Sequence, residues 1–210
     1  RWNQSYFTRM KEFVSAAEKR NIVIELTFFC PFYEDMQWKI SPMNASNNIN
    51  GVGKITKDDV YTMDKNGGLL PIQEAMVEKI VSELKGFENI IYEICNEPYF
   101  GGVKMEWQPH IASLISETEK KLGVRHLISQ NIANDSARIM NPHPDISVFN
   151  FHYASPPIAV KQNYHLNKVI GNNETGFRGQ QDSTYRKEGW EFILAGGALY
   201  NNLDYSFTAN

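Results

Sequence analysis

The chain has 210 residues, of which 42% are hydrophobic and 21% are charged, and its formal net charge is −3 at pH 7. This length and composition favour one ordinary globular domain over a disordered or fibrous chain. The small negative charge gives no electrostatic reason to expect nucleic acid or an anionic membrane as a partner. No apolar run approaches the roughly 18 residues that a membrane-spanning helix needs.

The cysteines and the first residues give limited information about the environment of the protein. Cys30 and Cys95 are too few for a disulfide framework or a zinc cluster, and we expect free buried thiols. Both follow predicted strands, so a bond between them stays open. The chain starts with Arg1-Trp2-Asn3, without an initiator methionine or a signal peptide, and we expect it to be a segment of a longer polypeptide.

The spacing of apolar residues predicts that helices and strands alternate along the chain. Helical spacing recurs in the segments 4–20, 71–86, 107–122 and 185–194. Short β-prone runs predict strands at 22–29, 90–94, 126–131, 148–153, 169–170 and 199–207, and a weak helix is expected before residue 169. Such alternation specifies a parallel sheet with right-handed connections.

A long polar and aromatic segment, residues 30–68, separates the first predicted strand from the second predicted helix. A loop of this length in a compact domain is usually functional or disordered. Tyr33, Trp38 and Tyr61 favour the functional option, as a wall of a binding cleft. A surface loop that packs its own aromatic rings explains any one of them equally well.

Two glutamates follow predicted strands. The buried run Ile90–Ile94 leads into Asn96-Glu97-Pro98, where the proline stops the ladder and favours an extended conformation at Glu97. Glu174 follows the run Val169-Ile170. Parallel strands present their chemistry at their carboxyl ends, and glycoside hydrolysis uses two carboxylates, one as the acid and one as the nucleophile or base. We therefore expect the two glutamates to act as a pair.

The two glutamate segments resemble those of a known enzyme class. Tyr92-Glu93-Ile94-Cys95-Asn96-Glu97-Pro98 is similar to the fourth-strand signature of clan A retaining glycoside hydrolases, particularly the cellulase-like family 5, and Glu174-Thr175-Gly176-Phe177 resembles the seventh-strand nucleophile segment. The resemblance implies a (β/α)8 TIM barrel, of which this chain holds strands three to eight. Residues 1–210 would then form one incomplete catalytic domain, and the first two βα units would belong to a missing N-terminal part of the same polypeptide.

The resemblance also implies roles for individual residues. Glu97 would be the general acid/base and Glu174 the nucleophile of a retaining double displacement at O-glycosidic bonds of a polysaccharide or oligosaccharide. Asn96 would contact a sugar hydroxyl. His152 and Tyr153 would lie near the nucleophile, but adjacent strand residues point to opposite faces unless the strand end bends, so we expect only Tyr153 to contact Glu174.

The remaining implications concern the cleft, the ligands and the location. Tyr33, Trp38, Asp204 and Tyr205 complete the expected substrate-binding residues, with a structural role as partner of a neighbouring loop as the alternative for Asp204. We expect no cofactor and no metal. The expected partner is a carbohydrate, with no nucleic acid and no membrane. A secreted or periplasmic location is plausible from the resemblance alone.

Several alternatives stay open at this point. The chain can be a catalytically silent carbohydrate-binding barrel, or a barrel enzyme of another chemistry such as a metal-dependent hydrolase. We expect Glu93 to be a buried structural carboxylate paired with a base rather than a third catalytic acid. Arg178 is expected in a loop salt bridge, with a substrate contact as the alternative. No sequence motif of a metallopeptidase or a serine hydrolase is present.

Overall fold

A computed structural model describes residues 2–202 of the chain. The chain divides into two compact units, one ending at Ile128 and the other beginning at Ser129. Within residues 2–202, no helix combines the length and the apolar character that crossing a bilayer requires.

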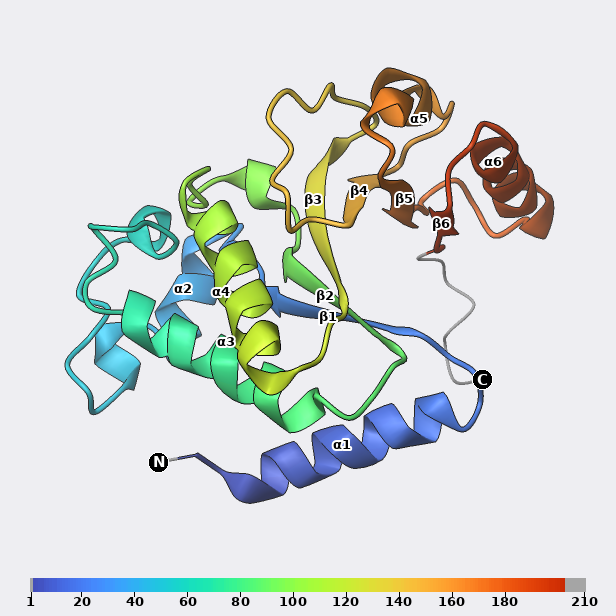
Figure 1. The fold of residues 1–210 in the computed structure, drawn as a ribbon. Helices are drawn as coiled ribbons and strands as arrows, with labels where there is room; N and C mark the ends of the chain where they lie inside the picture. The colour runs from blue at the N-terminus through green and yellow to red at the C-terminus, as the bar shows by residue number, and fades with distance from the viewer. Residues whose placement is uncertain (1, 203–210) are drawn as a thin grey trace. The chain divides into compact units, whose positions relative to one another are not determined.

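The first unit contains two parallel strands and the longest helices of the chain (Figure 1). Strands β1 (Ile24–Phe29) and β2 (Ile90–Cys95) pair in parallel, with Ile24 opposite Ile90 and Phe29 opposite Cys95. Every residue of β2 is buried, which agrees with its apolar composition around the single carboxylate Glu93. The helices of this unit are α1 (Gln4–Glu18), α2 (Asp35–Ile40), α3 (Leu70–Leu84) and α4 (Trp107–Leu122), with short 3-10 turns η1 (Ala45–Asn47), η2 (Lys57–Asp59) and η3 (Pro98–Phe100).

The segment 30–68 is ordered by its own polar side chains. The amide of Asn48 donates to the carbonyl oxygens of Pro42, Asn44 and Val52, and that of Asn66 donates to Thr62 and Met63. Gly53 has a φ of +78°, and a Cβ there would lie 1.8 Å from the carbonyl oxygen of Met43. Only glycine fits this position, so the segment forms a defined loop with short helices rather than a disordered connection.

The second unit holds the remaining strands, in chain order and parallel to one another. Strand β3 (Leu127–Asn134), which begins just before the unit, pairs with β4 (Val148–His152), and β4 pairs with β5 (Val169–Glu174). Strand β5 then pairs with β6 (Leu199–Tyr200). The helices are α5 (Ile158–Asn163), the 3-10 turn η4 (Tyr164–Leu166) and α6 (Asp182–Leu194).

The predicted elements are present at the predicted places, with changes at their ends. Strand β5 continues four residues past the predicted Val169-Ile170 and ends at Glu174 itself. Helix α6 begins at Asp182, three residues before the predicted start. The last strand is described as Leu199–Tyr200, and the part of the predicted strand from residue 203 onward lies outside the described residues.

Candidate active site

Glu97 lies directly after the carboxyl end of β2. The backbone N–H of Asn96 donates to the Phe29 carbonyl oxygen at 2.9 Å, which extends the pairing with β1 by one residue. Glu97 then adopts a left-handed conformation, with φ +41° and ψ +50°, and Pro98 begins η3. The extended conformation predicted for Glu97 is therefore wrong. The chain turns at once from β2 into η3, and the left-handed residue makes that turn at a cost of about 1–3 kcal/mol.

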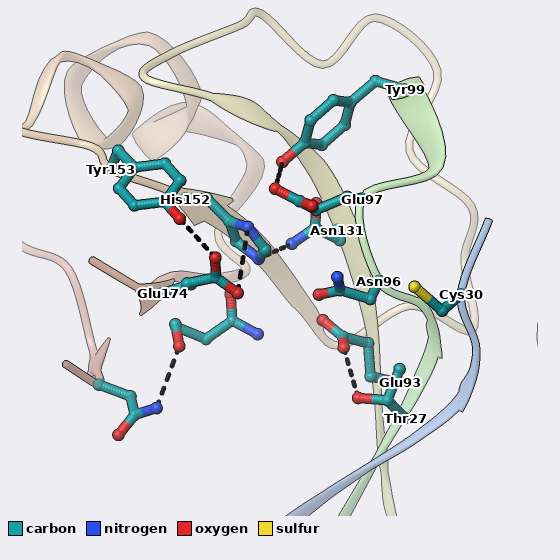
Figure 2. Close-up of polar contacts among 12 residues, drawn as sticks. Thr27, Cys30, Glu93, Asn96, Glu97, Tyr99, Asn131, His152, Tyr153 and Glu174 are labelled. Atoms are coloured by element: carbon teal, nitrogen blue, oxygen red, sulfur yellow. Dashed lines mark hydrogen bonds and ion pairs between the residues drawn. The ribbon is translucent and has the colours of Figure 1, made fainter. Parts of the chain in front are cut away.

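Two tyrosines donate to the Glu97 carboxylate. The Tyr33 hydroxyl lies 2.7 Å from Oε2, and the Tyr99 hydroxyl lies 3.5 Å from Oε1 (Figure 2 shows the Tyr99 contact). Tyr33 Oη also accepts hydrogen bonds from the side-chain amide of Asn96 at 3.1 Å and from the thiol of Cys30 at 3.4 Å. Desolvation raises the pKa of Tyr33, and its hydrogen bonds to Cys30 and Glu97 add to the effect, so the phenol keeps its proton and acts as a donor.

Glu93 is placed as a buried carboxylate below the end of the same strand. It is opposite Thr27 in the β1–β2 register, and the Thr27 hydroxyl donates to Glu93 Oε2 at 2.7 Å (Figure 2). Only 2% of Glu93 is exposed. This burial and this cross-strand bond agree with a structural carboxylate rather than a group that meets substrate.

The second glutamate, Glu174, is the last residue of β5 and contacts residues at the end of β4. The Tyr153 hydroxyl donates to Glu174 Oε1 at 2.5 Å, and His152 Nδ1 lies 3.7 Å from Oε2 (Figure 2). The side-chain amide of Asn131, on β3, lies 2.5 Å from His152 Nε2. With an amide N–H directed at Nε2, the ring proton sits on Nδ1, the nitrogen nearer to Glu174.

Both His152 and Tyr153 approach Glu174, so the expectation that only one of them does is wrong. The β4–β5 register shifts between Phe151 and His152, and Tyr153 has a φ of +53°. The strand end therefore bends, and two consecutive side chains turn toward the same carboxylate instead of alternating. Asn131 completes this cluster and was not singled out in the sequence, where its only signal is its position at the end of a predicted strand.

A buried glutamate on α6 anchors the loop after Glu174. Glu188 is 4% exposed, accepts from the Thr175 hydroxyl at 2.7 Å and forms an ion pair with Arg178. Arg178 thus makes the expected loop salt bridge. Its backbone N–H also donates to the Tyr185 hydroxyl at 3.1 Å. Glu188 could not be singled out from the sequence, because a single acid on a helix resembles any solvated helix residue.

Phe177 is a third residue near Glu174, after Asn131 and Glu188, to which the sequence analysis assigned no role. It is 69% exposed, its φ is +61°, and its ring centroid lies 6.1 Å from that of Tyr153. Glu97 and Tyr153 share the left-handed conformation with Phe177. Strained backbone of this kind in residues other than glycine concentrates at functional sites, where the surrounding structure holds it in place.

The other predicted site residues are placed as follows. Trp38 is 9% exposed and packs edge-on against Phe32, with ring centroids 5.2 Å apart, so little of its ring is open to a ligand. Tyr61 is a core residue rather than a cleft residue, because it is 2% exposed and packs against Phe29 and Trp107. Asp204 and Tyr205 lie outside the described residues.

The two cysteines are unbonded, and only one matches the expectation of burial. Cys95 is buried and Cys30 is exposed. Desolvation raises the pKa of the Cys95 thiol. Cys30 is exposed because it follows the last residue of β1, where the chain leaves the strand toward Tyr33.

Comparison with known proteins identifies solved structures but no sequence relatives. No family model matches the chain, and no curated protein matches it by sequence. The lactosyl-enzyme intermediate of endo-glycoceramidase II from Rhodococcus sp. matches with a TM-score of 0.66 at 10% identity, over 100% of this chain and 61% of that one. The same enzyme with a cellobiose-like imidazole gives a TM-score of 0.65 at 10% identity, over 100% and 62%.

A third match is the hyperthermostable endo-1,4-beta-D-mannanase from Thermotoga petrophila with maltose and glycerol. It has a TM-score of 0.59 and 13% identity, over 93% of this chain and 68% of that one. At such low identity the likeness concerns the fold alone, which this chain shares with a glycoceramidase and a mannanase. The strands and helices correspond to part of a (β/α)8 barrel, and the chain spans about three fifths of the length of the glycoceramidase.

Proposed function

We propose that this chain carries the catalytic carboxylates of a retaining glycosidase. The observation that supports it most is Glu174, which ends a parallel strand and receives the Tyr153 hydroxyl at 2.5 Å, in a chain with the fold of glycoside hydrolases. Glu97 follows the end of another parallel strand and is held by a second tyrosine. A retaining mechanism requires about 5 to 5.5 Å between the carboxyl group of the acid/base and that of the nucleophile.

In the first step, protonated Glu97 gives its proton to the glycosidic oxygen as the bond from that oxygen to the anomeric carbon breaks. Glu174 attacks the same carbon from the opposite side and forms a glycosyl ester. Tyr153 occupies Oε1 of Glu174, so Oε2 is the attacking oxygen. The phenol holds the carboxylate in line for this attack.

In the second step, the Glu97 carboxylate takes a proton from water, and the resulting hydroxide attacks the anomeric carbon. The ester bond breaks and Glu174 leaves as a carboxylate. Two inversions give net retention of configuration. The Nδ1–H of His152 faces Glu174 and limits the charge that accumulates there when the ester breaks.

The substrate class that we propose is a β-linked oligosaccharide or polysaccharide. Support comes from the neighbours, whose names describe a glycoceramidase and a β-1,4-mannanase. Phe177 offers an exposed ring beside Tyr153 for stacking against a sugar face, a contact that aromatic side chains make well.

The test uses Glu97→Gln and Glu174→Ala, with Glu12→Gln on the exposed side of α1 as the matched control. Each active-site substitution should lower kcat/KM for an aryl β-glycoside by at least about 10³-fold, and azide should restore turnover in Glu174→Ala by replacing the nucleophile. Glu12→Gln should behave as the unchanged protein. If both substitutions leave hydrolysis unchanged, the proposal fails. Sugar affinity by calorimetry without any hydrolysis would identify a silent carbohydrate-binding barrel instead.

A further inference from the structure

The hydroxyl of Tyr33 makes more hydrogen bonds to protein groups than a tyrosine in the wall of a binding cleft requires. Its hydroxyl oxygen lies within hydrogen-bond distance of three groups, Glu97 Oε2 at 2.7 Å, Asn96 Nδ2 at 3.1 Å and Cys30 Sγ at 3.4 Å. A tyrosine that only lines a cleft to stack on sugar exposes its ring and leaves its hydroxyl to water. Here the hydroxyl is committed to protein groups.

Counting protons decides the direction of these bonds. A tyrosine hydroxyl has one proton to donate and two lone pairs to accept with. The Asn96 amide N–H and the Cys30 S–H both donate to the oxygen and occupy the lone pairs. The single phenol proton is therefore directed at Glu97 Oε2. Asn96 directly precedes Glu97 in the chain, so two consecutive residues hydrogen-bond to the Tyr33 hydroxyl, Asn96 as the donor and Glu97 as the acceptor.

The loop that carries Tyr33 is itself held in place. Lys57, in η2, donates to the Tyr33 carbonyl oxygen at 3.3 Å, and the Tyr33 ring packs edge-on against Phe100, with centroids 5.7 Å apart. Lys57 also pairs with Asp35, the first residue of α2, at 3.2 Å. The position of the Tyr33 hydroxyl thus depends on η2 and on η3. One role of the long segment 30–68 is to hold Tyr33 in this position.

The two tyrosine contacts to the Glu97 carboxylate differ in length. It is a left-handed residue at a sharp turn, and its other tyrosine contact, to Tyr99, is at the 3.5 Å limit of a hydrogen bond. The bond from Tyr33, at 2.7 Å, is the shorter of the two. We infer that Tyr33 is a positioning residue, whose hydroxyl fixes the Glu97 carboxyl group for proton transfer to the leaving oxygen, and this inference rests on the proposed function of Glu97.

The inference has a specific kinetic consequence. Loss of the hydroxyl should matter most when the leaving group depends on the acid, as a phenol does, and least when it departs unaided, as 2,4-dinitrophenolate does. General acid catalysis contributes about 10²- to 10⁴-fold, and a displaced acid forfeits part of it. A merely structural residue would lower the turnover of both substrates by the same factor.

The experiment compares Tyr33→Phe with the intact protein, using kcat/KM because it reports on the step that breaks the glycosidic bond. We expect a fall of about 10- to 100-fold on the phenyl glycoside and less than about threefold on the dinitrophenyl glycoside. Tyr6→Phe, at a half-exposed tyrosine on α1, is the control and should match the intact protein on both substrates. An equal fall on both substrates, or no fall on either, overturns the inference.

A second measurement separates this inference from the proposed function. A crystal structure of Tyr33→Phe should show the Glu97 carboxyl group displaced from its place or spread over several conformers. An unchanged Glu97 position in that structure overturns the positioning role whatever the activity. If the intact protein hydrolyses no glycoside while the displacement is seen, the proposed function fails and the contact stands.

Discussion

Each of the two glutamates is held by a tyrosine hydroxyl within its own unit. Tyr33 donates to Glu97 and Tyr153 donates to Glu174. A phenol suits this task because it donates a hydrogen bond without competing for the proton that a carboxyl group must exchange. Tyrosine also has few rotatable bonds, so it loses little conformational entropy when it is fixed. The two tyrosines differ in origin, since Tyr33 comes from a loop and Tyr153 from a bent strand end.

The hydroxyl of Tyr153 can be tested with a single atom change. Tyr153→Phe keeps the ring contact with Phe177 and removes the 2.5 Å bond to Glu174. We expect kcat/KM for aryl glycosides to fall by about 10²-fold, whatever the leaving group, because the nucleophile rather than the acid is misplaced. Steady-state kinetics with phenyl and dinitrophenyl glycosides measure this.

The control for that substitution is Tyr164→Phe in η4, where the side chain is 68% exposed. It should leave the kinetics unchanged. A loss confined to the phenyl glycoside would contradict the assignment, since that pattern belongs to the acid.

At the scale of elements, the loop between β5 and α6 is anchored by two buried side chains of α6. Glu188 accepts a hydrogen bond from the Thr175 hydroxyl and forms an ion pair with Arg178, so it links the helix to the residue that follows Glu174. The hydroxyl of Tyr185 accepts from the Arg178 backbone N–H and donates to the Gly179 carbonyl oxygen. The orientation of Glu174 is thus coupled to the packing of a helix that does not itself reach the site.

Glu188→Gln should weaken this link. The neutral amide loses the ion pair with Arg178 and keeps at most part of the Thr175 bond, so we expect a loss of about 1–3 kcal/mol in unfolding free energy and a several-fold fall in kcat/KM. Urea denaturation and kinetics measure the two effects. Glu191→Gln, on the same helix with a solvent-exposed Lys187 partner, is the matched control and should change the stability by less than about 0.5 kcal/mol. Equal behaviour of the two variants would show that Glu188 anchors nothing.

Close packing between strands gives a second test at this scale. A Cβ at Gly171 on β5 would lie 2.3 Å from the Asn150 Oδ1 on β4 and 3.4 Å from the side chain of Leu199 on β6. Gly171→Ala should therefore destabilise the protein by about 1–3 kcal/mol, as overpacking does. Gly86→Ala, whose Cβ would meet nothing within 4 Å, is the control for urea denaturation. A Gly171→Ala protein as stable as this control would mean that the strands can separate slightly at no cost.

At the scale of the whole molecule, charged groups link α1 to α3 in the first unit. Glu83 accepts from Lys11 of α1 at 2.6 Å and from Lys79 of its own helix at 2.5 Å. These hydrogen bonds lower the pKa of Glu83 from 4.5 to about 2. A carboxyl group with a lowered pKa in the folded state contributes stability above its unfolded pKa, and this contribution disappears as the pH falls toward the folded value.

The effect of the Glu83 charge should be visible in the pH dependence of the unfolding free energy. Glu83→Gln should cost about 1 kcal/mol at pH 7, a modest value because Lys11 is partly exposed. The difference from the intact protein should shrink as the pH falls from about 4.5 to about 2, since Glu83 then becomes protonated in both states. Urea denaturation across that range measures the difference. A constant difference down to pH 2 would contradict the role of the charge.

Local sequence patterns predicted the elements and both glutamates correctly in place. Hydrophobic periodicity identifies a buried strand from its own residues, and proline or a turn of polar residues marks where it stops. The pattern could not reveal Asn131 or Glu188, because each acts through a partner more than ten positions away and neither residue type is unusual where it stands. The prediction of an extended conformation at Glu97 failed for a related reason. The turn into η3 requires a left-handed residue, and this requirement overrides the preference of residues before proline.

The sequence by itself determined the succession of strands and helices, and the placement of two glutamates where strands end, because these follow from the side chains of neighbouring residues. The contact of Tyr153 with Glu174 was expected and is present, but only the tertiary structure decided that Tyr33 donates to Glu97 and that His152 also lies beside Glu174. Tyr33 donates to Glu97 from the start of the loop that follows β1. Tyr153 turns to Glu174 because a register shift and a left-handed residue bend the end of β4. Such contacts depend on the direction of the backbone at a few strained residues, and that direction is set by packing between distant segments rather than by local preference.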